Sequence, residues 1–149
     1  MNEQIRYEIK NSKTLCGPFT SFDLEKAPDI PQYLFEEWFQ SALDNDVHEP
    51  QSMTLSSVDK HGFPDSRVLI LKDIDEDGWY FATSSNSKKG EQLRNNPNVS
   101  LCFYWSKVGR QIRIRGKAME MGKKLSTLDF MKRGTVAKAI ALIERQAKY

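Results

Sequence analysis

The clearest hydrophobic pattern in the chain runs from Pro31 to about Asn45. Its apolar residues fall at i, i+1, i+4, i+5, i+8 and i+9, which is one face of an α-helix; they are Leu34, Phe35, Trp38, Phe39, Ala42 and Leu43. We expect this amphipathic helix to cover the mouth or the side of a barrel. Residues 1–29 are polar, lack a sustained period and contain the breakers Gly17, Pro18 and Pro28, which favours an N-terminal arm or a loosely packed strand.

After this helix the chain changes to short runs rich in β-branched and aromatic residues. Residues 53–58 and 66–71, joined by a turn at 59–62, predict a hairpin, and residues 79–83 predict a third antiparallel strand after an acidic turn at 73–78. Two more strands are expected at 99–105 and 111–119, and the second of these alternates apolar and polar positions. Five strands at this spacing predict a small barrel, mainly β with flanking helices.

Helices are predicted at two further places. Residues 84–87 offer N-cap side chains for a short helix from about Lys88 to Arg94, which Asn95, Asn96 and Pro97 end. Residues 120–149 predict a helical tail in two pieces, at 125–132 and 135–149. Because we find neither an internal repeat nor a linker, we expect residues 1–149 to form a single domain.

Composition narrows the classes of function. The 22 basic and 20 acidic residues leave a formal charge of +2, so no global field draws the protein to nucleic acid or membrane. The chain has no run of about 18 apolar residues and starts too polar for a secretory signal, so we expect a cytoplasmic protein. Cys16 and Cys102 lie in dissimilar contexts and predict free thiols. His48 and His61 have no partner at metal-ligand spacing, so no metal site is expected.

Candidate chemistry centres on anion binding. Residues 83–90 combine hydroxyls, free N–H groups at a helix start and the cations Lys88 and Lys89, which suits a phosphate. A lysine in the first helical turn faces the positive end of the helix dipole, so two there suggest a bound anion. Arg67 begins an apolar strand that ends at Lys72, and their spacing of five places the two side chains on opposite faces of a regular strand. Both could contact one ligand only through a bulge, an edge approach or the end of the strand. The alternative is that these cations are solvated surface residues.

The sequence argues against two other functions. The exposed face of Arg113, Arg115 and Lys117, with Tyr104 and Trp105 nearby for stacking, could bind nucleic acid, but the balanced charge argues against it. We identify no nucleophile with a base and an orienting residue, and hence no catalytic side chain, which favours chemistry carried by a cofactor.

Taken together, several segments resemble the pyridoxamine 5'-phosphate oxidase family. They keep the family's order and spacing from about Pro31 to Ala118, with a fainter continuation to the C-terminus; they are Arg67-Val-Leu-Ile-Leu-Lys72, Phe81-Ala82-Thr83, Ser87-Lys88-Lys89, Asn95-Asn96-Pro97-x-Val99-Ser100-Leu101, Trp105, and Arg110-Gln111-Ile112 through Gly116-Lys117-Ala118. The resemblance implies a six-stranded antiparallel split β-barrel of the FMN-binding type. It also implies a homodimer with flavin at the subunit interface.

The resemblance also implies a set of flavin contacts. Arg67 and Lys89 would pair with the FMN phosphate with help from Thr83 and Lys88, and Gln111 would reach the flavin from the partner subunit. The full set implied for the cofactor is Arg67, Val68, Leu69, Lys72, Ala82, Thr83, Ser87, Lys88, Lys89, Gln111 and Gln146. Ala82 departs from the family, which often has Tyr there.

The substrate half of the site resembles the family less. In the oxidases, substrate phosphate is held by a Lys at the Lys72 position and by a later Tyr-Phe-x-x-Arg-Pro-x-x-Ser run. Here that run keeps Phe130 and Arg133 but has Asp129, Gly134 and Ala137 in place of Tyr, Pro and Ser. The sequence ends at Tyr149, before the family's later Trp, Arg-Leu-His and terminal elements, so we expect flavin binding to be kept more fully than pyridoxamine phosphate oxidation.

The function expected from the sequence is therefore an FMN-dependent oxidoreductase, in which the flavin accepts a hydride from a small substrate such as a phosphorylated B6 vitamer. A phenazine-biosynthesis-like oxidase with another substrate and a flavin reductase are variants of this hypothesis. The alternative from another class is a split-barrel protein that binds flavin or haem without turnover.

Overall fold

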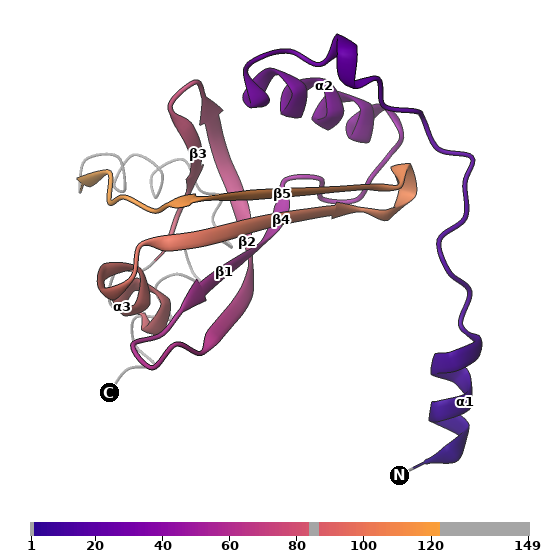
Figure 1. The fold of residues 1–149 in the computed structure, drawn as a ribbon, viewed down its shortest axis with the longest axis horizontal. Helices are drawn as coiled ribbons and strands as arrows, with labels where there is room; N and C mark the ends of the chain where they lie inside the picture. Colours follow the sequence, from indigo (N-terminus) through magenta and orange to yellow (C-terminus); the bar gives the residue numbers. More distant parts are fainter. Residues whose placement is uncertain (1, 84–86, 123–149) are drawn as a thin grey trace, which may run out of the picture.

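The structure, a computed structural model, describes residues 2–83 and 87–122 and has a curled antiparallel sheet at its centre (Figure 1). Within those ranges the strands are β1 (Ser52–Val58), β2 (Pro64–Asp75), β3 (Gly78–Phe81), β4 (Asn98–Trp105) and β5 (Arg110–Lys117). Their order in the sheet is β3-β2-β1-β4-β5, with antiparallel pairing throughout. The mainly β, antiparallel class is confirmed. The described residues form five strands, and the sixth strand of the expected barrel is not among them.

Two helices lie at opposite ends of the sheet (Figure 1). Helix α2 (Pro31–Asp44) starts with Pro31 in its first turn and buries Phe35 and Ala42, as its apolar stripe predicted. Helix α3 (Lys88–Asn95) packs beside β1, and Ser87 caps it by accepting a hydrogen bond from the Gly90 N–H at 3.3 Å. Both helices match the sequence predictions to within one residue, whereas the predicted tail helices lie outside the described residues.

Aromatic side chains fill the space between α2 and the sheet. Phe35 lies with its ring centroid 5.0 Å from that of Phe103 and 5.8 Å from that of Trp105. Phe39 and Trp79 complete the cluster around them. The Trp105 indole N–H donates to the Pro50 carbonyl at 2.9 Å, so the one polar group of this buried ring is hydrogen-bonded. Trp105 is therefore a core residue and not the exposed stacking platform considered from the sequence.

Strand β2 is longer than predicted because it contains a β-bulge. The pairing with β3 shifts register between Leu71 and Asp73, which makes Lys72 the extra residue. Leu71 and Ile74 both turn toward the core although they are three residues apart. The acidic segment expected to be a turn therefore continues the strand to Asp75, and the turn itself is confined to residues 76–77.

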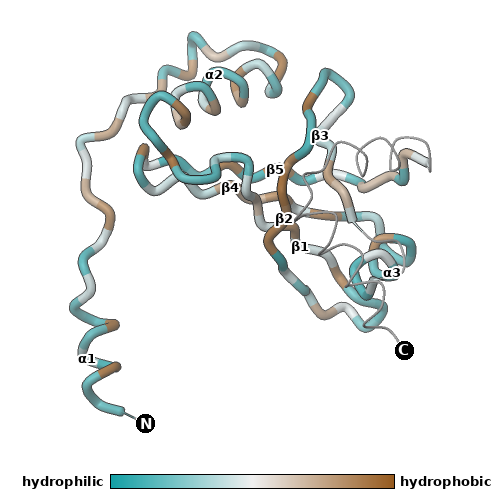
Figure 2. Tube along the Cα trace, turned by 180° about the vertical axis from the view of Figure 1, so that it is seen from behind, coloured by the Kyte–Doolittle hydropathy of each residue, from teal (hydrophilic) through white to brown (hydrophobic). Residues whose placement is uncertain are grey.

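The N-terminal arm contains a helix that the sequence did not predict. Helix α1 (Glu3–Asn11) is exposed along its whole length and stands apart from the sheet, coloured mainly hydrophilic (Figure 2). It forms because Asn2 caps it at 2.9 Å, with Glu3 in its first turn and Lys10 in its last. Local capping favours a helix here although its apolar residues Ile5 and Ile9, one turn apart, stay exposed.

Further along, the arm is anchored by two aromatic rings. Phe22 meets Trp38 edge-on at 5.2 Å, and Phe19 covers Gly109. Gly109 has a φ of +64°, and a Cβ there would come within 2.5 Å of the Phe19 ring, so this position requires glycine. Two 3-10 turns, Leu24–Lys26 and Ser106–Val108, flank these contacts. In the described ranges we find no helix with the length and apolar character needed to span a bilayer.

Candidate anion-binding site

The inward-facing positions of β1 and β2 turn polar next to α3. Ser57 follows Met53 and Leu55 on the buried face of β1, and it is itself only 1% exposed. Arg67 occupies the corresponding face of β2, where it donates from Nη1 to the Ser57 hydroxyl. A strand alternation that elsewhere builds the core therefore brings a buried hydroxyl and a guanidinium into contact.

Gln92 of α3 joins these two side chains. Its amide is 4% exposed, and its carbonyl oxygen accepts from Ser57 Oγ at 2.7 Å and from Arg67 Nη2 at 2.9 Å. Both acceptor bonds fix the orientation of the amide, so its NH₂ group points outward to Asp65 at 3.2 Å. Gln92 thus holds Arg67 in place from a helix and presents a donor at the same time.

Three donors converge on one oxygen of Asp65. Its Oδ2 lies 3.2 Å from Gln92 Nε2, 3.2 Å from Lys88 Nζ and 3.5 Å from Arg67 Nη2. The hydrogen bond from Gln92, followed by the bond and charge of Lys88, lowers the pKa of this carboxyl below its usual range. We call Ser57, Asp65, Arg67, Lys88 and Gln92 the β2–α3 cluster. Its donors are arranged to hold an anionic oxygen.

Thr83, two residues beyond the end of β3, is a further candidate for ligand contact. The Thr83 hydroxyl oxygen is buried and makes no hydrogen bond. Since Phe81 pairs with Leu71 in an antiparallel register, the chain beyond Phe81 heads along β2 toward Arg67. A buried hydroxyl left unpaired costs about 1–3 kcal/mol, so this position suits a ligand that supplies the missing partner.

The other residues expected at the cofactor are distributed over several surfaces. Lys88 and Ser87 belong to the start of α3 beside Arg67, and Lys89 is half-buried there. Leu69 packs inward against the core, whereas Val68, 66% exposed, points to the opposite face of the sheet. Ala82 is half-buried beside Thr83. Gln146 and Arg133 lie outside the described residues.

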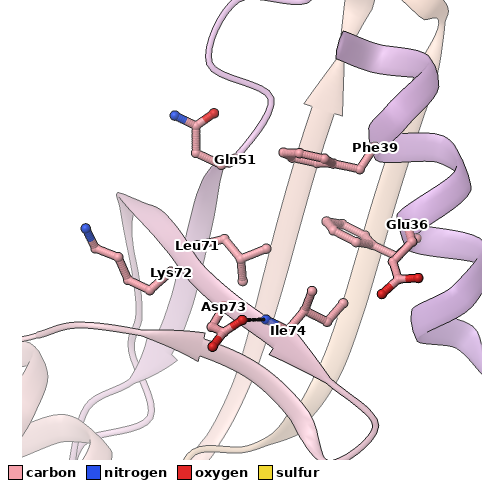
Figure 3. Close-up of a pocket in the computed structure, with 8 residues that line it drawn as sticks. Glu36, Phe39, Gln51, Leu71, Lys72, Asp73 and Ile74 are labelled. Atoms are coloured by element: carbon pink, nitrogen blue, oxygen red, sulfur yellow. Dashed lines mark hydrogen bonds between the residues drawn. The ribbon is translucent and has the colours of Figure 1, made fainter. Parts of the chain in front are cut away.

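Lys72 lies at a separate place from the β2–α3 cluster. It lines a hollow of about 260 Å³ between α2 and β2, together with Phe39, Gln51 and Glu36 (Figure 3). In this view Lys72 and Glu36 lie on opposite sides of the hollow. The bulge that could have brought Lys72 and Arg67 to one ligand is present, yet none of the residues bonded to Arg67 lines the hollow.

Strand β5 separates its cations between two faces. Gln111, Arg113, Arg115 and Lys117 are exposed, and Gln111 pairs with the exposed Tyr104 of β4. Arg110 instead turns inward, with its guanidinium carbon 4.3 Å from the centre of the Trp38 ring, and burial lowers its pKa. Gln111 is thus remote in register from Arg67, on a strand separated from β2 by β1 and β4.

Sequence reasoning missed Ser57, Asp65 and Gln92. A signal for two of them exists: Ser57 is the polar member of the buried series 53, 55, 57, and Gln92 lies one helical turn after Lys88. The register that joins them to Arg67 was not available before the sheet was known.

Comparison with known proteins identifies the family. Residues 39–147 match the family model described as pyridoxamine 5'-phosphate oxidase. The chain belongs to this family. A pyridoxine/pyridoxamine 5'-phosphate oxidase of Leptospira interrogans is 36% identical over 141 residues, covering 95% of this chain and 64% of the relative. Another from Pelagibacter ubique is 35% identical over 137 residues, covering 92% of this chain and 64% of the relative. The chain therefore spans slightly less than two thirds of these relatives.

Solved structures show the same fold. PhzG from Burkholderia lata, in complex with tetrahydrophenazine-1-carboxylic acid, has a TM-score of 0.75 and 28% identity over 79% of this chain and 59% of its own. A pyridoxamine 5'-phosphate oxidase-related, FMN-binding protein from Nostoc punctiforme has a TM-score of 0.57 and 18% identity over 79% of this chain and 62% of its own. The second likeness concerns the fold alone.

Proposed function

We propose that this member of the pyridoxamine 5'-phosphate oxidase family binds FMN through the β2–α3 cluster and acts as an FMN-dependent oxidoreductase. The observation that carries the proposal is the convergence of Arg67, Lys88 and Gln92 on a single anionic oxygen. A phosphate monoester presents the same kind of oxygen with a larger charge. In the structure these donors face the Asp65 carboxylate, which supports the proposal that they can hold an anion.

The residues present fit this cofactor. Arg67 and Lys89 would hold the phosphate, Thr83, Ser87 and Lys88 would assist, and the unpaired Thr83 hydroxyl would gain a partner. Ser57 and Gln92 would keep Arg67 oriented from behind, as they do in the structure. When bound, FMN supplies a two-electron acceptor for hydride, which side chains alone cannot provide.

We further propose that the flavin lies between two copies of the chain. Val68 and Gln111 are exposed on surfaces that Arg67 does not reach, although all three are expected to contact one flavin. The exposed Tyr104, beside Gln111, adds apolar surface to the same face. A homodimer would bring Gln111 and Gln146 of one copy to the Arg67 site of the other.

For the substrate, a phosphorylated B6 vitamer is the first candidate, because the curated relatives are named pyridoxine/pyridoxamine 5'-phosphate oxidase. Lys72 and Arg133 would then hold its phosphate. The second candidate is a reduced heteroaromatic carboxylic acid such as the one bound to PhzG. Asp129 and Ala137 lack the hydroxyl donors that the family has at these positions, which weakens the case for a phosphorylated substrate and leaves this second candidate.

Titration with FMN, followed by flavin fluorescence and the visible absorption spectrum, tests the cofactor. We expect saturable binding with one flavin per chain, and absence of binding would overturn the proposal. The loaded protein is then given pyridoxine 5'-phosphate or a tetrahydrophenazine carboxylic acid in air. Loss of the flavin absorbance on mixing, followed by its return, identifies the substrate class. If neither compound reduces the flavin, a protein that binds flavin without turnover is the better description.

A further inference from the structure

We propose that Asp65 is a resident anion of the β2–α3 cluster, which the phosphate of an incoming ligand must displace, and that it sets how strongly the site prefers phosphorylated over unphosphorylated flavin. This inference rests on the proposed function. It concerns the regulation of affinity at the same site and assigns a role to a residue outside the flavin contacts expected from the sequence.

The geometry shows that Asp65 and a phosphate would compete. Asp65 Oδ2 takes donors from Arg67, Lys88 and Gln92 together, with distances of 3.2 to 3.5 Å. A phosphate oxygen bound by Arg67 and Lys88 would need the same volume and the same N–H groups. The carboxylate and the phosphate are both anionic, so sharing the cluster would place like charges in contact.

Displacement of Asp65 is easier than displacement of the other members. Its side chain is 39% exposed, so the carboxylate can move into water and stay solvated. Ser57 and Gln92 are 1% and 4% exposed and are bonded to each other and to Arg67. The buried part of the cluster can therefore remain in place while the exposed carboxylate leaves.

The charges of the cluster favour the exchange of Asp65 for a phosphate only in part. Arg67 and Lys88 carry two positive charges beside Asp65, which neutralises one of them, and Lys89 adds a third cation at the start of α3. A phosphate monoester carries about −1.5 to −2 near neutral pH and is attracted more strongly to these cations when the Asp65 charge is absent. Asp65 thus stabilises the empty cluster and opposes the phosphate. It has no such effect on riboflavin, which lacks the phosphate.

The test is Asp65→Asn, which removes the charge and keeps the shape. Asp46→Asn is the matched control, because it makes the same change of net charge at a side chain 93% exposed and paired with Lys107, outside the cluster. Asn also suits the positive φ of 51° at position 46. For the full chain, Kd is measured for FMN and for riboflavin by fluorescence quenching.

We expect Asp65→Asn to bind FMN about tenfold more tightly than wild type, a modest figure because the carboxylate is partly exposed. Riboflavin affinity should stay within about twofold, and Asp46→Asn should match wild type for both ligands. An equal gain for FMN and riboflavin, an unchanged FMN affinity, or a loss of FMN affinity would each overturn the inference, the last because Asp65 would then position the cations.

Thermal unfolding with inorganic phosphate gives a second measurement that needs no flavin. Without phosphate, we expect Asp65→Asn to fold and to melt slightly below wild type, because Arg67 and Lys88 lose the negative charge that pairs with them. Added phosphate should raise its Tm more than that of wild type, and an equal response would overturn the inference. If wild type fails to bind FMN while Asp65→Asn binds it, the proposed function falls and the inference stands. If neither binds, both fall.

Discussion

The two ends of the β1–β2 ladder use the same backbone pattern for different purposes. Under α2, the inward positions are Met53 and Leu55 on β1 and Leu69 and Leu71 on β2, and they pack against aromatic rings. Toward α3 the same alternation continues into Ser57 and Arg67, which are satisfied by hydrogen bonds. The apolar end is stabilised mainly by the burial of apolar side chains, whereas the buried polar groups of the other end need hydrogen-bond partners. A change at one end should therefore affect stability, and a change at the other should affect ligand binding.

The two helices reflect the same division. Helix α2 contributes Phe35 and Phe39 to the aromatic end, whereas α3 contributes Gln92 and Lys88 to the polar end. At the polar end the Asp65 carboxylate is partly in solvent, and just beyond β3 the Thr83 hydroxyl has no hydrogen-bond partner. We infer that the aromatic end holds the fold together while the polar end is prepared for an anion.

The largest effect is expected at the aromatic end. Phe103 is fully buried, and Phe103→Ala should lower the free energy of unfolding by about 3–5 kcal/mol because it leaves a cavity among packed rings. Urea denaturation of the protein measures this. Tyr104→Ala, one residue along and 62% exposed, should cost less than about 1 kcal/mol. Equal losses for the two variants would contradict the assignment of this end as the core.

The next effect is expected at Arg67. Arg67→Met should weaken FMN binding about 100-fold, because it removes a charged donor that Ser57 and Gln92 hold in place. Riboflavin affinity should change far less, since riboflavin has no phosphate. Fluorescence titration measures both ligands. Arg6→Met removes an exposed cation from α1 and should leave FMN affinity unchanged; a comparable loss there would show that the effect is one of overall charge.

At Thr83 we expect a smaller effect, with opposite signs for stability and for FMN affinity. Thr83→Val removes a buried hydroxyl that lacks a partner, so the unfolding free energy without ligand should stay constant or rise by up to about 1 kcal/mol. FMN affinity should fall about fivefold, because the ligand loses a hydrogen bond. Thermal unfolding and FMN titration measure the two quantities. Thr20→Val in the exposed arm should alter neither. A Thr83 variant that loses stability without losing affinity would remove this residue from the site.

The smallest effect is the acid sensitivity of the polar end. The pKa of Asp65 is lowered in the folded protein, so its stabilising contribution is present above the unfolded pKa of about 3.9 and is lost as the pH falls through the folded value. Wild type should therefore melt above Asp65→Asn at neutral pH, and the gap should close on acidification below about pH 4. Melting curves from pH 7 to pH 3 follow it. A gap that widens with acid would have the wrong sign.

The sequence predicted much of the fold because the signals were local. The stripe from Leu34 to Leu43 gave α2, and the cap at Ser87 with Pro97 beyond gave α3. It failed for β2, where the acidic residues after Lys72 resembled a turn, because a bulge is set by pairing with β3 and not by composition. It also failed for α1, where Asn2 provides a cap but the apolar residues Ile5 and Ile9 stay exposed.

The sequence by itself determined which chemistry this protein can offer. Arg67, Thr83, Lys88 and Lys89, and the resemblance they carry, follow from residue order, since helix caps, strand ends and motif spacing are local properties. Only the tertiary structure decided that Asp65 and Gln92 stand beside Arg67 and that Lys72 and Gln111 do not. The physical reason is register: side chains distant in the chain meet only when strands pair and a helix packs on them, and a shift of one residue would move each to the other face.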